Sequence, residues 1–320
     1  VTTEYPLRTK GGSAMSRLDT KLDQLFTYAP VLSYKKDSKF ILMSDCHRGQ
    51  GNWGDNFLPN QNVFYGALEY YYDHGFTYIE LGDGDELWEN RSMNAILRTH
   101  SRVFRLMNAF YRQKRLYMLY GNHDIIKRRQ NLLKPDCRNY YCDTIEKEDF
   151  FLDKILYHEG LILQSEEDNS QLFLIHGHQG SLLNDELWHL GRFLVRYVWR
   201  PLELVGFKAP TGAGRSKKLV EKIEKELCSY ARTNSKILIA GHTHRPVFPH
   251  PGDCPYFNDG SCVHPQCITG LEIENNALTL VKWSISATPE RLLYIDRQIL
   301  DGPEPIAAYG NCGIRETEPK

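Results

Sequence analysis

Residues that bind metals stand directly after several apolar runs of the chain. They are carboxylates, imidazoles and one amide, and they form five groups: Asp45 with His47, Asp83, Asn122 with His123, His176, and His242 with His244. This mixture of ligands is typical of sites for first-row transition metals. It holds too few thiols for a structural zinc site and too many imidazoles for calcium or for oxygen-ligated magnesium. The sequence therefore predicts a first-row metal site.

Two of the imidazoles stand one residue apart in the stretch IAGHTHRP, residues 239–246. In a strand, side chains two residues apart point to the same face. We therefore expect His242 and His244 to face one site. Arg245, which follows them, is either a solvated surface charge or a contact for a substrate phosphate.

The elements that must position these residues follow from the apolar pattern. Strands are predicted at 39–44, 76–81, 116–120, 171–175, 236–240, 267–274, 277–283 and 291–296, and helices at 62–73 and 93–113. The predicted elements between residues 39 and 120 follow the order strand–helix–strand–helix–strand, which favours a parallel sheet. Ligands of open α/β sheets bind at the carboxyl ends of strands. One shared site at these strand ends is therefore expected.

The ordered motifs Asp-x-His, Gly-Asp-x-x-Glu, Gly-Asn-His-Asp, His-Gly-His and Gly-His-x-His resemble those of the calcineurin-like metallophosphoesterase superfamily. The resemblance spans about 200 residues. It implies an α/β fold, a four-layer α-β-β-α sandwich, with two divalent metals at the strand ends. Manganese is the first expectation for these metals, with iron, zinc or cobalt as alternatives.

The resemblance also assigns a role to each matching residue. It implies that one metal is held by Asp45, His47 and His244, the other by Asn122, His176 and His242, and that Asp83 bridges the two. Asp85 is close in sequence, but Gly82 favours Asp83 because glycine lets the backbone turn near the metals. His178 is expected to be a neighbour of the site rather than a ligand.

Two further residues are expected to be catalytic. The resemblance implies that His123 stabilises the transition state or protonates the leaving oxygen. The adjacent Asp124 is expected to orient that imidazole as its carboxylate partner. The reaction implied is hydrolysis of a phosphoester by a metal-bound hydroxide, since two metals can clamp the phosphate and acidify a water.

The segment 181–235 lies between the last two histidine motifs and is predicted to be a helical insert, or lid. Its arginines at 192, 196 and 200 recur every four positions and so share one helix face. We take Arg48, Arg196 and Arg245 as candidate contacts for the substrate, against the alternative of solvated charges. An insert at this place, together with GHTHRP, resembles the architecture of the UDP-2,3-diacylglucosamine hydrolase group.

The net charge and the pI bear on the class of substrate. The formal net charge of −1 and a pI of about 6.9 give no overall attraction to nucleic acid. The expected substrate is a phosphomonoester or a pyrophosphate-linked small molecule. A UDP-2,3-diacylglucosamine-type pyrophosphatase, a protein Ser/Thr phosphatase and a nuclease are alternative enzymes. A scaffold that has lost catalysis is disfavoured because the ligand set is intact.

The chain is expected to be cytoplasmic, with mostly reduced thiols, because its eight cysteines include no CxxC pair. No apolar run approaches a membrane span, although the apolar side of the insert could contact a membrane peripherally. The oligomeric state stays open. The expected organisation is a tail and leading helix at 1–36, with residues before Met15 either native or added, a metallophosphoesterase domain at 37–310, and a C-terminal tail at 311–320.

Overall fold

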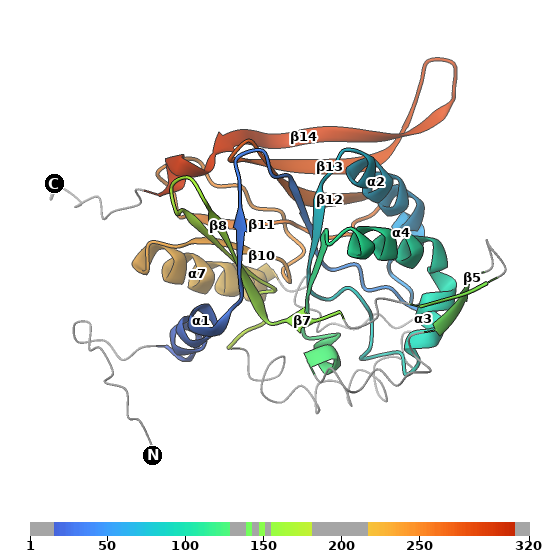
Figure 1. The fold of residues 1–320 in the computed structure, drawn as a ribbon, viewed down its shortest axis with the longest axis horizontal. Helices are drawn as coiled ribbons and strands as arrows, with labels where there is room; N and C mark the ends of the chain where they lie inside the picture. Colours follow the sequence, from blue (N-terminus) through green and yellow to red (C-terminus); the bar gives the residue numbers. More distant parts are fainter. Residues whose placement is uncertain (1–15, 129–138, 143–146, 151–154, 181–216, 311–320) are drawn as a thin grey trace, which may run out of the picture.

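The structure is a computed structural model that describes residues 16–128, 139–142, 147–150, 155–180 and 217–310 (Figure 1). The predicted C-terminal tail and most of the predicted insert, with its three arginines, lie outside the described residues.

The larger sheet has seven strands and is mixed. Its order is β14 (Leu293–Pro305), β13 (Ala277–Ala287), β12 (Cys267–Glu274), β2 (Phe40–Met43), β3 (Thr77–Leu81), β4 (Leu116–Leu119) and β7 (Tyr157–His158). Strands β2, β3, β4 and β7 are parallel to one another. Strand β12 is antiparallel to β2, β13 to β12, and β14 to β13. The predicted parallel unit is therefore confirmed.

The second sheet has five strands. Its order is β1 (Val31–Tyr34), β8 (Gly160–Ser165), β9 (Gln171–Ile175), β10 (Ile237–Ala240) and β11 (Tyr256–Asn258). The predicted strands at 171–175 and 236–240 thus lie in a different sheet from β2, β3 and β4. A separate two-stranded ladder joins β5 (Asn139–Cys142) to β6 (Lys147–Phe150).

Helices cover the outer faces of both sheets. They are α1 (Arg17–Tyr28), α2 (Gln61–Asp73), α3 (Met93–Thr99), α4 (Ser101–Arg112) and α7 (Lys217–Thr233), with short 3-10 turns η1 (Leu58–Asn60), η2 (Ile125–Arg128) and η8 (Ile306–Tyr309). The single helix predicted at 93–113 is broken at His100, whose buried ring is held by Asp55 and Gln61. Periodicity alone could not reveal this break, because both halves keep apolar residues on one face.

Three apolar clusters separate four layers. Between the sheets, residues such as Leu42, Ile79 and Leu119 pack with Leu172, Leu174 and Ile239. The outer face of the larger sheet packs on α2 and α4 through residues such as Tyr78, Phe64 and Phe104. The outer face of the smaller sheet packs on α1 and α7 through residues such as Phe173, Leu22 and Leu227. The predicted α-β-β-α sandwich is confirmed.

The N-terminal elements belong to this sandwich. Strand β1 pairs in parallel with β8, and Leu22 of α1 is fully buried in the outer cluster of the smaller sheet. The sandwich therefore begins ahead of residue 37, where the sequence placed the start of the domain.

Two further findings concern the cysteines and membrane-spanning helices. Cys228 of α7 forms a disulfide with Cys254, whereas Cys46, Cys262 and Cys267 are free, so one bridge is the exception to the expectation of mostly reduced thiols among these five. In the part of the chain that the structure describes, no helix is both long and apolar enough to cross a membrane.

Truncating Leu42 tests the packing between the sheets. Leu42 is fully buried beside Leu271 and Ile79, so Leu42→Ala should lower the free energy of unfolding by about 2–5 kcal/mol. Leu58→Ala is the control, because Leu58 is 39 % exposed and should cost about 0.5 kcal/mol or less. Urea unfolding monitored by circular dichroism measures both. Equal effects of the two changes would contradict the buried position of Leu42.

Candidate metal centre

The first two ligand loops run side by side beyond the ends of their strands. The N–H of Asp45 donates to Gly82 O at 3.1 Å, and the N–H of His47 donates to Asp83 O at 2.9 Å. The parallel pairing of β2 with β3 therefore continues into the loops. This fixes Asp45, His47 and Asp83 relative to one another before any metal binds.

The backbone is strained at most of the predicted ligands. Five of them adopt positive φ, namely Asp45 (52°), His47 (47°), Asp83 (49°), His242 (68°) and His244 (55°). Non-glycine residues in this region cost on the order of 1–3 kcal/mol each, and such strain clusters at functional sites. The fold therefore holds these side chains in positions that an unconstrained chain would avoid.

The expectation from strand alternation at GHTH needs correction. Strand β10 ends at Ala240, so His242 and His244 lie in the following loop. Their positive φ values turn them towards different partners: His244 joins Asp45, and His242 joins Asp83. Both imidazoles face the same region, but alternation is not the reason.

Gly82 allows the ligand loops to approach each other. It has φ of 97°, and a Cβ at this position would lie 2.7 Å from Gly121 N and 2.8 Å from His176 Nδ1. Any side chain would push apart the loops after β3, β4 and β9. The loop geometry therefore requires glycine here.

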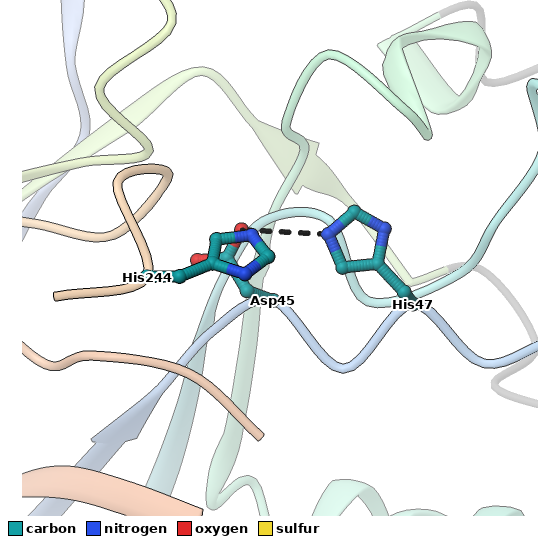
Figure 2. Close-up of side chains that lie close together, drawn as sticks. All are labelled: Asp45, His47 and His244. Atoms are coloured by element: carbon teal, nitrogen blue, oxygen red, sulfur yellow. Dashed lines mark ion pairs between the residues drawn. The ribbon is translucent and has the colours of Figure 1, made fainter. Parts of the chain in front are cut away.

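Among the described residues, three groups of side chains could each hold a metal ion: Asp45 with His47 and His244 (Figure 2), Asp83 with His176 and His242, and His47 with Glu86 and His123. The first two consist of predicted ligands, and the Asp45 group is the first. The Oδ1 atom of Asp45 lies 3.0 Å from His244 Nε2 and 3.6 Å from His47 Nε2. Its other oxygen, Oδ2, accepts the backbone N–H of His242 at 2.8 Å. One carboxylate oxygen is thus anchored, and the other faces two imidazoles.

The second group is Asp83, His176 and His242. His176 Nδ1 donates to Leu81 O at 2.8 Å, which leaves Nε2 as the ring nitrogen able to bind a metal. That Nε2 lies 3.1 Å from Asp83 Oδ2. Asn122 is buried, and the backbone N–H of the next residue, His123, donates to Asp83 Oδ1 of this group at 2.7 Å.

Asp83 lies between the two groups. Its Oδ2 is 3.1 Å from His176 Nε2 of the second group and 3.8 Å from His47 Nε2 of the first. Asp85, the alternative carboxylate, is instead paired with Arg48 and Lys127. His178 is buried but belongs to neither group.

The ligand atoms fit a cation. Five buried atoms of the predicted ligands have no hydrogen-bond partner among the described residues: Asp45 Oδ1, His47 Nε2, Asn122 Oδ1, His176 Nε2 and His242 Nε2. Leaving a buried polar atom without a partner costs about 1–3 kcal/mol. These atoms are the ones that could coordinate metal, so a bound cation would satisfy them together.

The electrostatics agree with this fit. Burial tends to raise the pKa of Asp45, but the His244 and His176 imidazoles outweigh it and hold that pKa well below its usual range. Burial tends to lower the pKa of His176, yet the Asp83 and Asp45 carboxylates raise it to about 9. Burial, with the neighbouring His176, lowers the pKa of His242 to about 3. The carboxylates thus stay ionised and favour positive charge.

The expected partner of His123 is wrong. Its Nδ1 lies 2.7 Å from Glu86 Oε2, and its ring stacks on Trp88 with centroids 4.5 Å apart. Asp124 instead accepts the Gly121 N–H and the Lys127 ammonium, both at 2.7 Å. Glu86 also accepts from His47 Nδ1 at 3.0 Å, so one carboxylate contacts both imidazoles. The Gly-Asp-x-x-Glu spacing was the available signal for this role.

The expectation that Arg48 contacts substrate is also wrong. Arg48 is 0 % exposed, and its two terminal nitrogens donate to both oxygens of Glu80 at 2.8 Å. Its Nε donates to Asp85 Oδ1 at 2.8 Å. Glu80 in the apolar run TYIEL was the sequence signal, since a charge within a buried strand needs a buried partner.

Lys127 extends this buried network. Its ammonium lies 2.7 Å from both Asp85 Oδ2 and Asp124 Oδ2. Arg48, Asp85 and Asp124 each follow a predicted metal ligand by one or two residues. The buried charged network therefore links the three loops that carry these ligands.

Two candidate substrate contacts remain, Arg245 and Arg196. Arg245 pairs with Glu224 of α7, through Nε at 2.9 Å and a second contact from the adjacent nitrogen. Its guanidinium is thus already engaged, and contact with a phosphate stays a prediction. Arg196 lies outside the described residues.

A model of a known family matches more than half of the chain. The model of a family described as calcineurin-like phosphoesterase matches residues 38–246, a range that includes every predicted metal ligand. None of the curated proteins matches the chain. Among solved structures, Chaetomium thermophilum Vps29 is similar, with 10% identity, 83% of this chain and 96% of that chain covered, and a TM-score of 0.37.

Substituting Arg48 distinguishes a buried structural role from contact with substrate. Arg48→Met should lower the free energy of unfolding by about 3–5 kcal/mol, because Glu80 would be left buried without its cation and Asp85 would keep only Lys127. Arg232→Met is the control, because Arg232 is exposed in the last turn of α7 and its loss should cost about 0.5 kcal/mol or less. Urea unfolding in a metal chelator measures both. Unchanged stability of Arg48→Met with a raised KM would restore the substrate role.

Proposed function

The chain belongs to the calcineurin-like phosphoesterase family, and on that premise we propose that it is a hydrolase that cleaves phosphate esters at a centre of two divalent metals. The observation that carries this proposal is the shared position of Asp83. Its Oδ2 lies between His47 and His176, which belong to different ligand groups.

Each metal has its own set of side chains in this proposal. Asp45, His47 and His244 hold one, Asn122, His176 and His242 hold the other, and Asp83 contacts both. When bound, two such metals would acidify a water molecule and neutralise charge on the phosphoryl oxygens. Manganese is the first candidate for a ligand set of this kind, with iron, zinc and cobalt as alternatives.

His123 is the proposed proton donor to the leaving oxygen. Glu86 lies at its Nδ1, so Nε2 is the ring nitrogen left to meet the substrate. Trp88 stacks against the ring and limits its rotation. The chain thus fixes both the orientation of the imidazole and the atom that carries the proton.

The substrate approaches from the most exposed side of the centre. The side chains of His123 and His244 are 23 % and 28 % exposed, whereas those of Asp45, Asp83 and His176 are nearly inaccessible. We propose a phosphomonoester or a pyrophosphate-linked small molecule as substrate. The neutral overall charge disfavours nucleic acid.

The finer resemblance to the UDP-2,3-diacylglucosamine hydrolase group rests on GHTHRP and on the insert, and it concerns architecture. The chain has Gly-Asn-His-Asp at 121–124 and His-Gly-His at 176–178, where that group has other residues at the third position. A screen with manganese should therefore include phosphomonoesters, linear and cyclic diesters, nucleotide pyrophosphates and a phosphopeptide. Preference for a phosphopeptide or a diester would replace the proposed substrate class without affecting the metal centre.

Replacing Asp83 tests the shared ligand. Asp83→Asn should lower manganese-dependent hydrolysis of p-nitrophenyl phosphate by more than the roughly 10–100-fold typical of an outer-shell change, with fewer metals bound per chain. Asp73→Asn, at an exposed position at the end of α2, is the control. Activity assays and metal analysis by mass spectrometry give both readouts. Full turnover in Asp83→Asn would exclude the shared role.

Replacing His123 separates proton transfer from metal binding. His123→Ala should lower kcat by about 10²–10⁴-fold, as expected for a lost general acid, with the metal content unchanged. Glu86→Gln should lower kcat less, because the imidazole remains. Kinetics and metal analysis on the same samples check this. A His123→Ala protein that loses metal would make His123 a ligand instead.

A further inference from the structure

Asn258 lies beside the loop GHTH, residues 241–244, which carries two of the candidate ligands. It is the last residue of β11 and pairs in register with Ala240, the last residue of β10. Its backbone exchanges two hydrogen bonds of 3.0 Å with Val247, just beyond the loop. Asn258 is fully buried, and its backbone is thus fixed close to both ends of the loop. It stands outside the five motifs and beyond residues 38–246, so neither the motifs nor the family match assigns it a role.

The side chain of Asn258 contacts the loop directly. Its amide nitrogen donates to Gly241 O at 2.7 Å and to Thr243 Oγ1 at 3.1 Å. Its amide oxygen accepts the Gly260 N–H at 2.9 Å, which fixes the nitrogen on the side of the loop. Gly241 and Thr243 are the two neighbours of His242 in the chain. The side chain therefore holds the loop on both sides of a candidate ligand.

His242 is the centre of a tight turn. The Thr243 N–H donates to Gly241 O at 2.8 Å, and His242 has φ of 68°. A three-residue turn with positive φ at its centre is the rare and strained form. The bonds from Asn258 go to the same two residues that close this turn, so they stabilise it. Thr243 also precedes His244, whose φ is 55°.

An amide matches what this place requires. The contacts use two donors towards the loop and one acceptor towards Gly260, and an asparagine side chain supplies both kinds of group. The Thr243 hydroxyl, which accepts from Asn258, donates in turn to Glu224 Oε1 of α7 at 3.2 Å. The residue between the two imidazoles is therefore held by two different elements of the fold.

We infer that Asn258 is a positioning residue for metal binding, which holds His242 and His244 in the conformation that lets each reach its own ligand group. The inference rests on the metal centre of the proposed function. His242 belongs to the group of Asp83, and His244 belongs to the group of Asp45. A change at Asn258 should therefore weaken binding at both groups, although the side chain itself is not a candidate ligand.

Manganese binding by the full chain tests this role. Asn258→Ala should raise the Kd for manganese about 10–100-fold, as is typical when an outer-shell contact to metal ligands is lost. It should also reduce the rise in Tm that manganese gives the wild type. Equilibrium dialysis with metal analysis by mass spectrometry gives the Kd, and thermal unfolding with and without manganese gives the Tm.

Leu163→Ala is the matched truncation control. Leu163 is fully buried and pairs with Leu172, at the end of β9 that lies away from His176. The change should lower the Tm of the metal-free chain because it leaves a cavity in the core. The Kd for manganese should stay that of the wild type, which separates a loss of stability from a loss of ligand positioning.

Thr243→Val is a second variant, which removes one acceptor of Asn258 and keeps the shape of the side chain. It should raise the Kd for manganese about fivefold, the factor that one hydrogen bond is worth. Wild-type affinity in both loop variants, an equal loss in Leu163→Ala, or a wild type that binds no manganese would overturn the inference. With the affinities shifted as expected, a wild type that hydrolyses no phosphate ester would contradict the proposed function while the inference holds.

Discussion

The position of the Asp83 carboxylate is the constraint on which the site depends. One oxygen lies between His47 and His176, and the other holds the N–H of His123. This single side chain therefore links the loops that follow β2, β3, β4 and β9. It can do so only because Gly82 lets these loops approach and because the backbone at Asp83 accepts a positive φ. The strain at the ligands is maintained by the packing of two sheets beneath them.

Behind the ligands lies a second, fully buried layer of charge. Arg48 and Lys127 connect Glu80, Asp85 and Asp124, and these residues sit next to the ligands in sequence. Burying so many charges is costly unless every one is paired. The same pairs fix the loops that carry the ligands. Arg48, which the sequence suggested as a substrate contact, is thus part of the rigid support of the metal centre.

The sequence indicated which polar residues would come together, because each group of candidate ligands follows an apolar run. The structure brings Asp45, His47 and His244 into one group and Asp83, His176 and His242 into another, and metal binding by these residues stays a prediction. The sequence did not predict the features that depend on the direction in which a side chain points. The turn of Asp124 towards Lys127 rather than His123, the burial of Arg48 and the break at His100 are set by contacts between residues far apart in the chain. It also could not show that β9 and β10 lie in a second sheet, because strand order is not encoded in the apolar pattern.

Anomalous diffraction from crystals of the manganese-loaded protein tests the central claim most directly. The account predicts two peaks about 3.5–4 Å apart, with Asp83 in contact with both. One peak would come from the group of Asp45, His47 and His244, and the other from the group of His176 and His242. A single peak, or a peak held instead by His47, Glu86 and His123, would contradict the shared role of Asp83.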